Sequence, residues 1–266
     1  EVTGVQTCAL PIYHSRTKFC GTGRGRIKMY TYESRVRFSE VDHYETMTLP
    51  SIINYFQDGS IFQSEDIGLG VDYLKEKKRA WVLSSWQVVI ERYPRIGEKI
   101  RIGTWATGFQ GLYGYRNFCM WDEKGEKAAY ANSIWVYMDL EKQRPARPPK
   151  EEEEKYGTEE ALEMEYAPRK ISLPQDALSG EIFPVRKYHI DTNEHVNNCQ
   201  YVQMALEAAG EELMVRQMRA EYKKSALLHD KILPKVAKEG ERTVVELCEP
   251  DGGVYAVVEL TGEKRC

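Results

Sequence analysis

The densest group of chemically capable side chains lies in residues 189–198, which read HIDTNEHVNN. This segment holds two of the chain's five histidines, two carboxylates and three asparagines. A neutral imidazole beside a carboxylate and an amide can take a proton from water and return it to a leaving group. Asp191, Asn193 and His195 are therefore candidates for acid–base hydrolysis.

A structural interpretation of the same segment competes with this one. The helical pattern NNCQYVQMALEAAGEEL follows directly, and asparagine and aspartate commonly cap helices and form turns. Asn197 or Asn198 would then cap the helix while His195 packs locally. In the functional interpretation, the N–H groups at the start of that helix stabilise a developing oxyanion.

The chain around this segment consists of two halves with the same plan. VRFSEVDHYETM (36–47) aligns with VRKYHIDTNEHV (185–196), sharing Val, Arg and Asp at equal offsets, and a helical pattern follows each copy. VVIERYPRIGEKI (88–100) then aligns with AEYKKSALLHDKI (220–232). An internal duplication accounts for the repeated order of elements.

The first copy serves as a control for the second. The aspartate is kept in both copies, but Tyr44 and Thr46 stand where the second copy has Asn193 and His195. A shared aspartate is compatible with a structural role. An amide and an imidazole that occur in one copy only indicate that this copy carries the chemistry.

The elements that must position these residues predict an α+β fold. In the first half, LPSIINYFQDGSIFQSEDIG carries Leu49, Ile52, Ile53 and Phe56 at helical spacing, and four segments rich in Trp, Tyr, Val and Ile follow. The second half repeats a helix and several strands. We expect each half to be a long antiparallel sheet wrapped around a central helix.

Composition shifts along the chain predict its organisation. Residues 1–28 are expected to be a non-native leader, because VTGVQTCALPI matches the translation of a common sequencing adapter and GRGRIKM is typical of a purine-rich run before a start codon. Sequencing the transcript across this junction tests that hypothesis. The remainder divides into a first domain at 29–140, a linker rich in prolines and charges at 141–176, and a second domain at 177–266.

Bulk composition excludes several classes of protein. No apolar run approaches the roughly 20 residues of a membrane helix, and the six cysteines lack ligand spacing, which predicts a cytoplasmic protein without a zinc site or disulfide framework. Without the leader the chain has 32 basic and 40 acidic residues, a net charge of −8. This acidity disfavours a nucleic-acid binder.

The motif D-x-N-x-H-V-N-N, followed by CQYVQMALE, resembles the active-site segment of acyl-acyl-carrier-protein (acyl-ACP) thioesterases. VRFSEVDHYETMTLPSIINYFQDGS and RAWVLSSWQVVIERYPRIGEKI also resemble that family, so the resemblance extends from residue 29 to about residue 264. It implies a tandem double-hotdog fold and hydrolysis of the thioester between a fatty acyl chain and acyl carrier protein. It implies no metal or nucleotide cofactor.

The resemblance also implies roles for individual residues. Asn193 would orient the thioester carbonyl or the attacking water, His195 would act as base and then acid, and Asp191 would fix the site or assist as a base. An acyl-chain pocket in the first half would be lined by Leu49, Ile52, Ile53 and Phe56. The structural alternative is that these four form ordinary core, and both hold where a ligand reaches the core. Two basic groups are candidates to meet the acidic carrier protein: Arg144, Arg147 and Lys150, or Lys223 and Lys224.

One strand departs from the plant members of the family. Their pattern E-Y-R-R-E-C supplies a glutamate and a cysteine, whereas EYKKSA places Ser225 and Ala226 at those positions. Glu221 is a poor substitute, since it lies about 13 Å from Ser225 along the strand. We therefore expect direct attack by water, with Ser225 helping to hold it, and a buried structural role for Cys199.

Two other functions remain as alternatives. A hotdog thioesterase acting on acyl-CoA would use the same chemistry on another carrier, and a non-catalytic acyl-thioester-binding protein would use only the pocket. A hotdog dehydratase is disfavoured by the asparagine-rich motif. The duplication already supplies a pseudo-dimer, and a homodimer of the whole chain is a further expectation.

Overall fold

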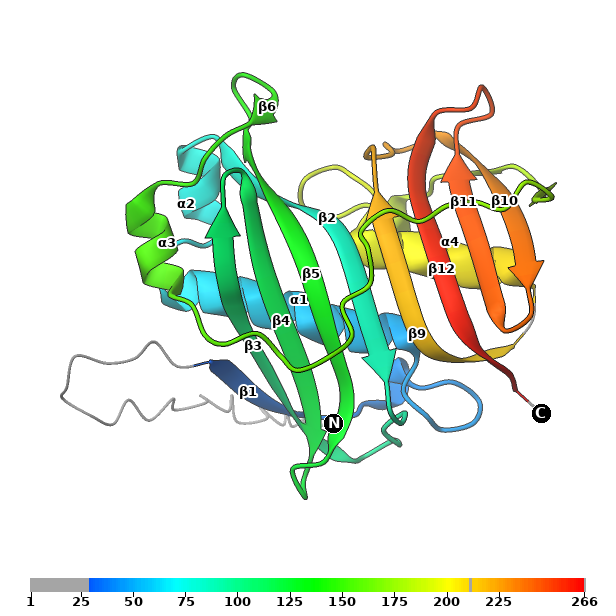
Figure 1. The fold of residues 1–266 in the computed structure, drawn as a ribbon, viewed down its shortest axis with the longest axis horizontal. Coiled ribbons are helices and arrows are strands. Elements are labelled where there is room, and N and C mark those ends of the chain that lie inside the picture. The colour runs from blue at the N-terminus through cyan, green and yellow to red at the C-terminus, as the bar shows by residue number, and fades with distance from the viewer. Residues whose placement is uncertain (1–28, 211, 266) are drawn as a thin grey trace, which may run out of the picture.

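The computed structural model describes residues 29–210 and 212–265, and it consists of a continuous antiparallel sheet curved around two long helices (Figure 1). The expected leader, residues 1–28, lies outside the described residues. The predicted α+β architecture, with a long antiparallel sheet and a central helix in each half, is confirmed.

The first half contains β1 (Tyr30–Arg35), the 3₁₀ helix η1 (Phe38–Glu40), α1 (Leu49–Asp66), α2 (Val71–Glu76), β2 (Arg79–Ile90), β3 (Lys99–Gln110), β4 (Tyr113–Asp122) and β5 (Lys127–Asp139). The linker at 141–176, here called the connecting segment, contains β6 (Arg144–Pro145) and α3 (Lys150–Tyr156). The remaining elements are β7 (Leu178–Ser179), β8 (Phe183–Pro184), η2 (Lys187–His189), α4 (Asn198–Ala209), β9 (Leu213–Tyr222), β10 (Lys231–Glu239), β11 (Arg242–Cys248) and β12 (Val254–Lys264).

The two halves share one sheet because their equivalent strands pair with each other. The strand order is β1-β3-β4-β5-β2-β9-β12-β11-β10-β7, so β2 of the first half lies beside β9 of the second. These strands run antiparallel, with Gln87 opposite Arg219 at the centre of the register. These two residues directly precede the aligned segments 88–100 and 220–232, so they are equivalent positions of the two halves. The halves are therefore related by a pseudo-twofold axis through this pair.

Local signals define the ends of both long helices. Thr48 precedes α1, and its hydroxyl accepts a hydrogen bond from the Ser51 N–H at 3.2 Å. Asn197 precedes α4, and its Oδ1 accepts from the Cys199 N–H at 2.9 Å. The helix ends at Gly210, whose φ of 69° is the left-handed conformation that glycine adopts without strain. Of the two residues that the structural interpretation offered as the cap, Asn197 and Asn198, the structure uses Asn197.

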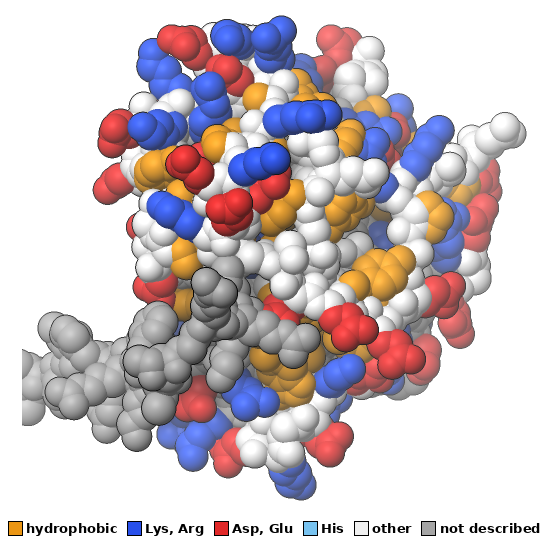
Figure 2. Space-filling view, turned by 60° about the vertical axis from the view of Figure 1, so that its left-hand side comes forward, with side chains coloured by type: hydrophobic (Ala, Val, Ile, Leu, Met, Phe, Trp, Pro, Cys, Tyr) orange, Lys and Arg blue, Asp and Glu red, His pale blue; other side chains and the backbone are white. Residues whose placement is uncertain are grey.

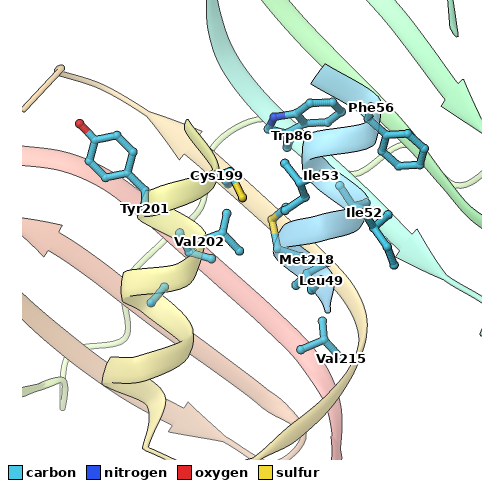
Figure 3. Packing of buried hydrophobic residues seen from close by; sticks show 14 of the residues in the cluster. Leu49, Ile52, Ile53, Phe56, Trp86, Cys199, Tyr201, Val202, Val215 and Met218 are labelled. Atoms are coloured by element: carbon cyan, nitrogen blue, oxygen red, sulfur yellow. The ribbon is translucent and has the colours of Figure 1, made fainter. Parts of the chain in front are cut away.

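One apolar core spans the junction of the halves. Figure 3 shows Ile53 of α1 and Val202 of α4 pointing toward each other, with Met218 of β9 beside them. All three side chains are fully buried. Because the core is continuous, the N-terminal end of α4 is held rigidly against the first half, and the loop that precedes α4 is held with it.

The connecting segment crosses the outer face of the sheet, on the side away from the helices (Figure 1). Its backbone satisfies buried polar side chains of that face. Asn117 Oδ1 accepts from the Leu162 N–H at 2.9 Å, and Gln87 Oε1 accepts from the Ala167 N–H at 2.9 Å. Buried amides need such partners, so the segment covers the sheet rather than hanging free as a tether.

Candidate active site

The predicted catalytic loop has a tightly specified backbone. The Asp191 N–H donates to the His195 carbonyl at 2.8 Å, and Asp191 Oδ1 accepts from the Asn193 N–H at 2.8 Å. Glu194 has a left-handed φ of 62°. Asp191 therefore shapes the loop and sets where the side chains at 193 and 195 project.

The first half contains the same loop. The Asp42 N–H donates to the Thr46 carbonyl at 2.9 Å, Asp42 Oδ1 accepts from the Tyr44 N–H at 3.0 Å, and Glu45 also has a φ of 62°. Asp42 also pairs with Arg265 at 2.5 Å. The duplicated geometry confirms the alignment, and it shows that the shared aspartate has an architectural role in both copies.

The side chains that differ between the copies also differ in their bonding. Thr46 Oγ1 lies 3.1 Å from Asp42 Oδ1 and accepts from Arg265 at 2.7 Å. By contrast, the side chains of Asn193 and His195 are exposed and make no hydrogen bond to any residue within 29–210 and 212–265. The amide and the imidazole are therefore available to a ligand.

The second histidine of the motif has a structural role. His189 is buried, and its Nδ1 accepts from the Arg186 N–H at 3.0 Å. In the first copy Glu40 accepts from the Arg37 N–H at 2.8 Å in the same way. Burial, assisted by the charge of Arg186, lowers the pKa of His189 and favours its neutral form. The two histidines of the segment thus serve different purposes.

The loop opens onto a cavity of about 440 Å³. Asp191, Asn193 and Asn198 of the second half line one part of it. The first half supplies most of the remaining wall, including Gln57, Ser60, Ile61, Ser64, Trp81, Ala106, Phe109, Arg116 and Trp135, and α3 of the connecting segment adds Tyr156. The volume is within the range of roughly 300–1,000 Å³ that is typical of small-molecule sites.

The start of α4 offers a hydrogen-bond donor to this cavity. Asn198 is the first helical residue, and within the described chain its N–H has no acceptor. Its carbonyl accepts from the Tyr222 hydroxyl at 3.0 Å. A free N–H at a helix N-terminus is suited to stabilising negative charge on a ligand oxygen.

Ser225 lies close to the loop in the fold. The Val196 N–H donates to the Ala226 carbonyl at 3.0 Å. His195 precedes Val196 and Ser225 precedes Ala226, so the two residues lie on adjacent segments. Both side chains are exposed, and neither lines the cavity. The roles assigned to them stay predictions.

The four side chains expected to contact the acyl chain lie in the core. Leu49, Ile52, Ile53 and Phe56 are buried against the sheet and α4, and none of them lines the cavity. The adjacent face of the same helix lines it instead. Contact between these four residues and an acyl chain stays a prediction.

Gln57 is a cavity residue that the sequence analysis missed. Its Nε2 lies 3.5 Å from Asn197 Oδ1, and its buried Oε1 has no hydrogen-bond partner in the described part of the chain. Ser60 and Ser64 follow on the same helix face. A polar stripe at spacings of three and seven residues along an apolar helix was the available signal.

Glu221, which the sequence analysis considered a poor substitute for the plant glutamate, bonds the connecting segment. The carboxylate is buried, and its Oε2 accepts from the Ile171 N–H of the connecting segment at 3.1 Å. It thereby fastens that segment to the outer face of the sheet.

Cys199 is expected to be dispensable for turnover. The thiol is 1% exposed and donates to the Pro50 carbonyl at 3.3 Å, and burial raises its pKa to about 12. The thiolate is the reactive form, and it is essentially absent until the pH approaches that value. Cys199→Ala should keep kcat within about threefold, since the change removes only a small buried group. N-ethylmaleimide should not lower the hydrolase activity expected of the native protein at pH 7.5, and inactivation that Cys199→Ala abolishes would contradict this view.

Residues 29–210 and 212–265 contain neither a metal-binding cluster nor a membrane-spanning helix. No group of three or more His, Cys, Asp or Glu side chains is arranged there to hold a metal ion. None of the helices in this part of the chain combines the length and apolar character needed to cross a membrane.

Family models match both halves of the chain. Residues 27–156 match the model of the acyl-ACP thioesterase N-terminal domain, and residues 174–247 match the model of the acyl-ACP thioesterase C-terminal domain. A palmitoyl-acyl carrier protein thioesterase of Arabidopsis thaliana is 27% identical over 225 residues, covering 76% of this chain and 54% of that protein. A dodecanoyl-[acyl-carrier-protein] hydrolase of Cinnamomum camphora is 28% identical over 187 residues, covering 65% and 48%. The chain spans about half the length of the curated relatives it matches.

Solved structures share the fold. The acyl-ACP thioesterase of Bacteroides thetaiotaomicron has a TM-score of 0.77 at 22% identity, covering 88% of this chain and 98% of that one. The 12:0-ACP thioesterase of Umbellularia californica has a TM-score of 0.77 at 18% identity, covering 89% and 98%. These similarities show the double-hotdog fold. The two domain models show that this chain belongs to the acyl-ACP thioesterase family.

Proposed function

We propose that this protein hydrolyses the thioester between a fatty acyl chain and the phosphopantetheine arm of acyl carrier protein. The products are a free fatty acid and the carrier thiol, which ends chain elongation. One observation carries the proposal: the loop with Asn193, whose amide is free, opens onto a cavity whose walls come largely from the other half. Membership of the family supports the reaction class.

The residues of the loop and of α4 suggest a mechanism. His195 takes a proton from water as the water oxygen attacks the thioester carbonyl carbon, and Asn193 orients the carbonyl or the water. The Asn198 N–H stabilises the resulting oxyanion. The carbon–sulfur bond then breaks, and His195 returns the proton to the thiolate. Ser225 assists in holding the water. Catalytic hydrogen bonds often form fully only with substrate bound, so an exposed His195 fits this role.

The first experiment measures fatty-acid release from acyl-ACP and acyl-CoA substrates of graded chain length. Residues 29–266 and a His195→Ala variant are compared. Hydrolysis that favours the carrier protein and is lost in the variant supports the proposal. Hydrolysis that favours acyl-CoA supports the first alternative. A folded protein that binds acyl thioesters without turnover supports the binding-protein alternative.

The surface beside the cavity suggests how the carrier protein docks. Lys75 and Arg79 line the cavity. Arg144 of β6 lies opposite Asp139 of β5 in the strand register, and the Asp139 carboxylate forms an ion pair with Arg79 at 3.1 Å. Figure 2, which brings the α2 and α3 side forward, shows Lys and Arg side chains gathered over its upper part, together with acidic ones. In the other candidate patch, Lys224 is already paired with Glu249 at 2.6 Å. We therefore favour the Arg144 group as part of the docking surface.

Charge reversal tests this docking surface. Lys75→Glu combined with Arg144→Glu should raise KM for acyl-ACP by about tenfold at low salt, because opposing charges steer association. The rise in KM should be much smaller for uncharged acyl-pantetheine, because that substrate lacks the acidic carrier protein. Lys223→Glu combined with Lys224→Glu is the matched control, with KM for acyl-ACP within about twofold of wild type. If the control pair alone raises KM, the other patch is the docking surface.

A cytoplasmic location and a homodimer of the whole chain remain predictions. Cell fractionation tests the location. Light scattering of the purified chain tests the oligomeric state.

A further inference from the structure

The cavity wall contains a buried cation without a counterion. Arg116 of β4 is 7% exposed, and its Nη1 donates to Gln63 Oε1 at 2.5 Å and to Thr104 Oγ1 at 3.0 Å. The guanidinium also lies 5.5 Å from the centre of the Tyr156 ring. These partners are all neutral, and no Asp or Glu of the described residues forms an ion pair with Arg116.

Burial lowers the pKa of Arg116 to about 10, so the group stays charged at neutral pH. Buried charges are normally paired, because removing a charge from water is costly. The retention of an unpaired guanidinium on a cavity wall therefore points to a ligand group that completes its environment.

Arg116 lies at the far end of the cavity from the catalytic loop. Near the loop, Gln57 approaches Asn197 at 3.5 Å. Farther along α1, Ser64 Oγ lies 3.0 Å from the hydroxyl of Tyr156, the ring beneath Arg116. Seven helical residues separate Gln57 from Ser64, a rise of about 10 Å. An extended chain advances about 1.2 Å per bond, so this distance corresponds to roughly nine bonds.

Part of the guanidinium is free to face this space. A guanidinium has five N–H donors, and only Nη1 has acceptors among the described residues. The Nε and Nη2 atoms make no hydrogen bond to the described residues, and Arg116 lines the cavity. A plain hydrocarbon terminus placed there would exclude water and leave these donors without an acceptor.

We infer that the far end of the cavity receives an oxygen-bearing group of the acyl chain. The preferred substrates are then acyl thioesters with a hydroxyl, keto or carboxylate oxygen near the end distant from the thioester. This inference rests on the proposed thioesterase function for the orientation of the chain, with the thioester at the loop and the oxygen at Arg116.

Pairs of acyl-ACP substrates of equal length test the inference. Unsubstituted, ω-hydroxy and ω-carboxy chains of about eight to twelve carbons are compared, to bracket the distance from loop to arginine. In the wild type, kcat/KM for at least one oxygenated member should exceed that of the unsubstituted chain by about tenfold or more, as a hydrogen bond to a charged group allows. Comparison of the ω-hydroxy series with the ω-carboxy series shows whether the site prefers a neutral oxygen acceptor or an anion. If the wild-type kcat/KM for the oxygenated chain is equal to or lower than that for the unsubstituted chain at every length, the inference is overturned.

Arg116→Met removes the donors while keeping an unbranched apolar side chain. It should bring the ratio of kcat/KM for the oxygenated chain to kcat/KM for the unsubstituted chain to about one. Arg101→Met is the control, because Arg101 is exposed over the Trp121 ring outside the cavity, and its ratio should equal the wild type's. Thermal unfolding verifies that each variant is folded. If Arg116→Met does not fold, Arg116→Lys replaces it and should reduce the preference, since an ammonium cannot reproduce the planar fork. A preference that a folded Arg116 variant leaves unchanged overturns the inference.

Calorimetric binding of free fatty acids separates this inference from the proposed function. Dodecanoic acid and 12-hydroxydodecanoic acid share a carboxylate head, so an Arg116-dependent preference for the hydroxylated acid reports the distal site without turnover. If binding shows that preference but no thioester is cleaved, the hydrolase proposal fails and the distal site stands. If thioesters are cleaved without any oxygen preference in rate or binding, the distal site fails and the hydrolase proposal stands.

Discussion

His195→Ala is expected to lower kcat for acyl-ACP hydrolysis by roughly 10²–10⁴-fold, the contribution typical of a positioned general acid–base. The thermal unfolding temperature should stay within about 2 °C, because the imidazole is exposed and makes no hydrogen bond within the described residues. Single-turnover measurement of fatty-acid release isolates the chemical step from product dissociation.

The duplication supplies the matched control, Thr46→Ala. Thr46 occupies the equivalent position in the first loop, where its hydroxyl bonds Asp42 and Arg265. Its loss should lower the free energy of unfolding by about 1–2 kcal/mol and leave kcat unchanged. Full activity in a folded His195→Ala variant would return the imidazole to a structural role. Equal losses of activity in both variants would show that the loops act only through architecture.

Phe56→Ala is expected to lower the free energy of unfolding by about 3–5 kcal/mol. Phe56 is fully buried, and its ring centre lies 5.3 Å from that of Phe118 and 6.3 Å from that of Trp86. Removing the ring leaves a void between α1 and the sheet that well-packed neighbours fill only partly. Denaturant unfolding of both proteins measures the difference.

Ile61→Ala is the control on the cavity side of the same helix. Ile61 is 46% exposed and lines the cavity, so stability should change by less than about 1 kcal/mol. KM should rise for the longer acyl chains, because apolar contact with the substrate is lost. If a folded Phe56→Ala variant changes the chain-length profile as Ile61→Ala does, the acyl chain reaches Phe56 and the prediction made from the sequence is right.

The loop of residues 191–195 shows how far local sequence information reaches. The bonds that shape its turn are local: the Asp191 N–H donates to the His195 carbonyl, four positions on, and Asp191 Oδ1 accepts from the Asn193 N–H, two positions on. The duplicated loop with Asp42 repeats that pattern. Loops of this kind are encoded by short-range chemistry, and comparison of the two copies separated the architectural aspartate from the side chains left free.

The apolar helix shows where that information ends. Helical spacing correctly predicted that Leu49, Ile52, Ile53 and Phe56 form one buried face. It did not distinguish a face packed against atoms from a face beside an open cavity. Both require apolar residues at the same spacing, and the difference depends on what lies opposite.

The amino-acid sequence by itself determined the two-part plan, an asparagine cap for the second helix, the loop with Asp191, Asn193 and His195, and the resemblance to the family. These features depend on residues near one another in the chain or on direct comparison of its halves. Only the tertiary structure decided that Gln57, Arg116 and Tyr156 share one cavity with that loop, and that the connecting segment fastens to Asn117 and Gln87. Those contacts join residues tens of positions apart, and no local pattern encodes them, because they arise from the pairing of β2 with β9 and the curvature of the sheet around α1 and α4.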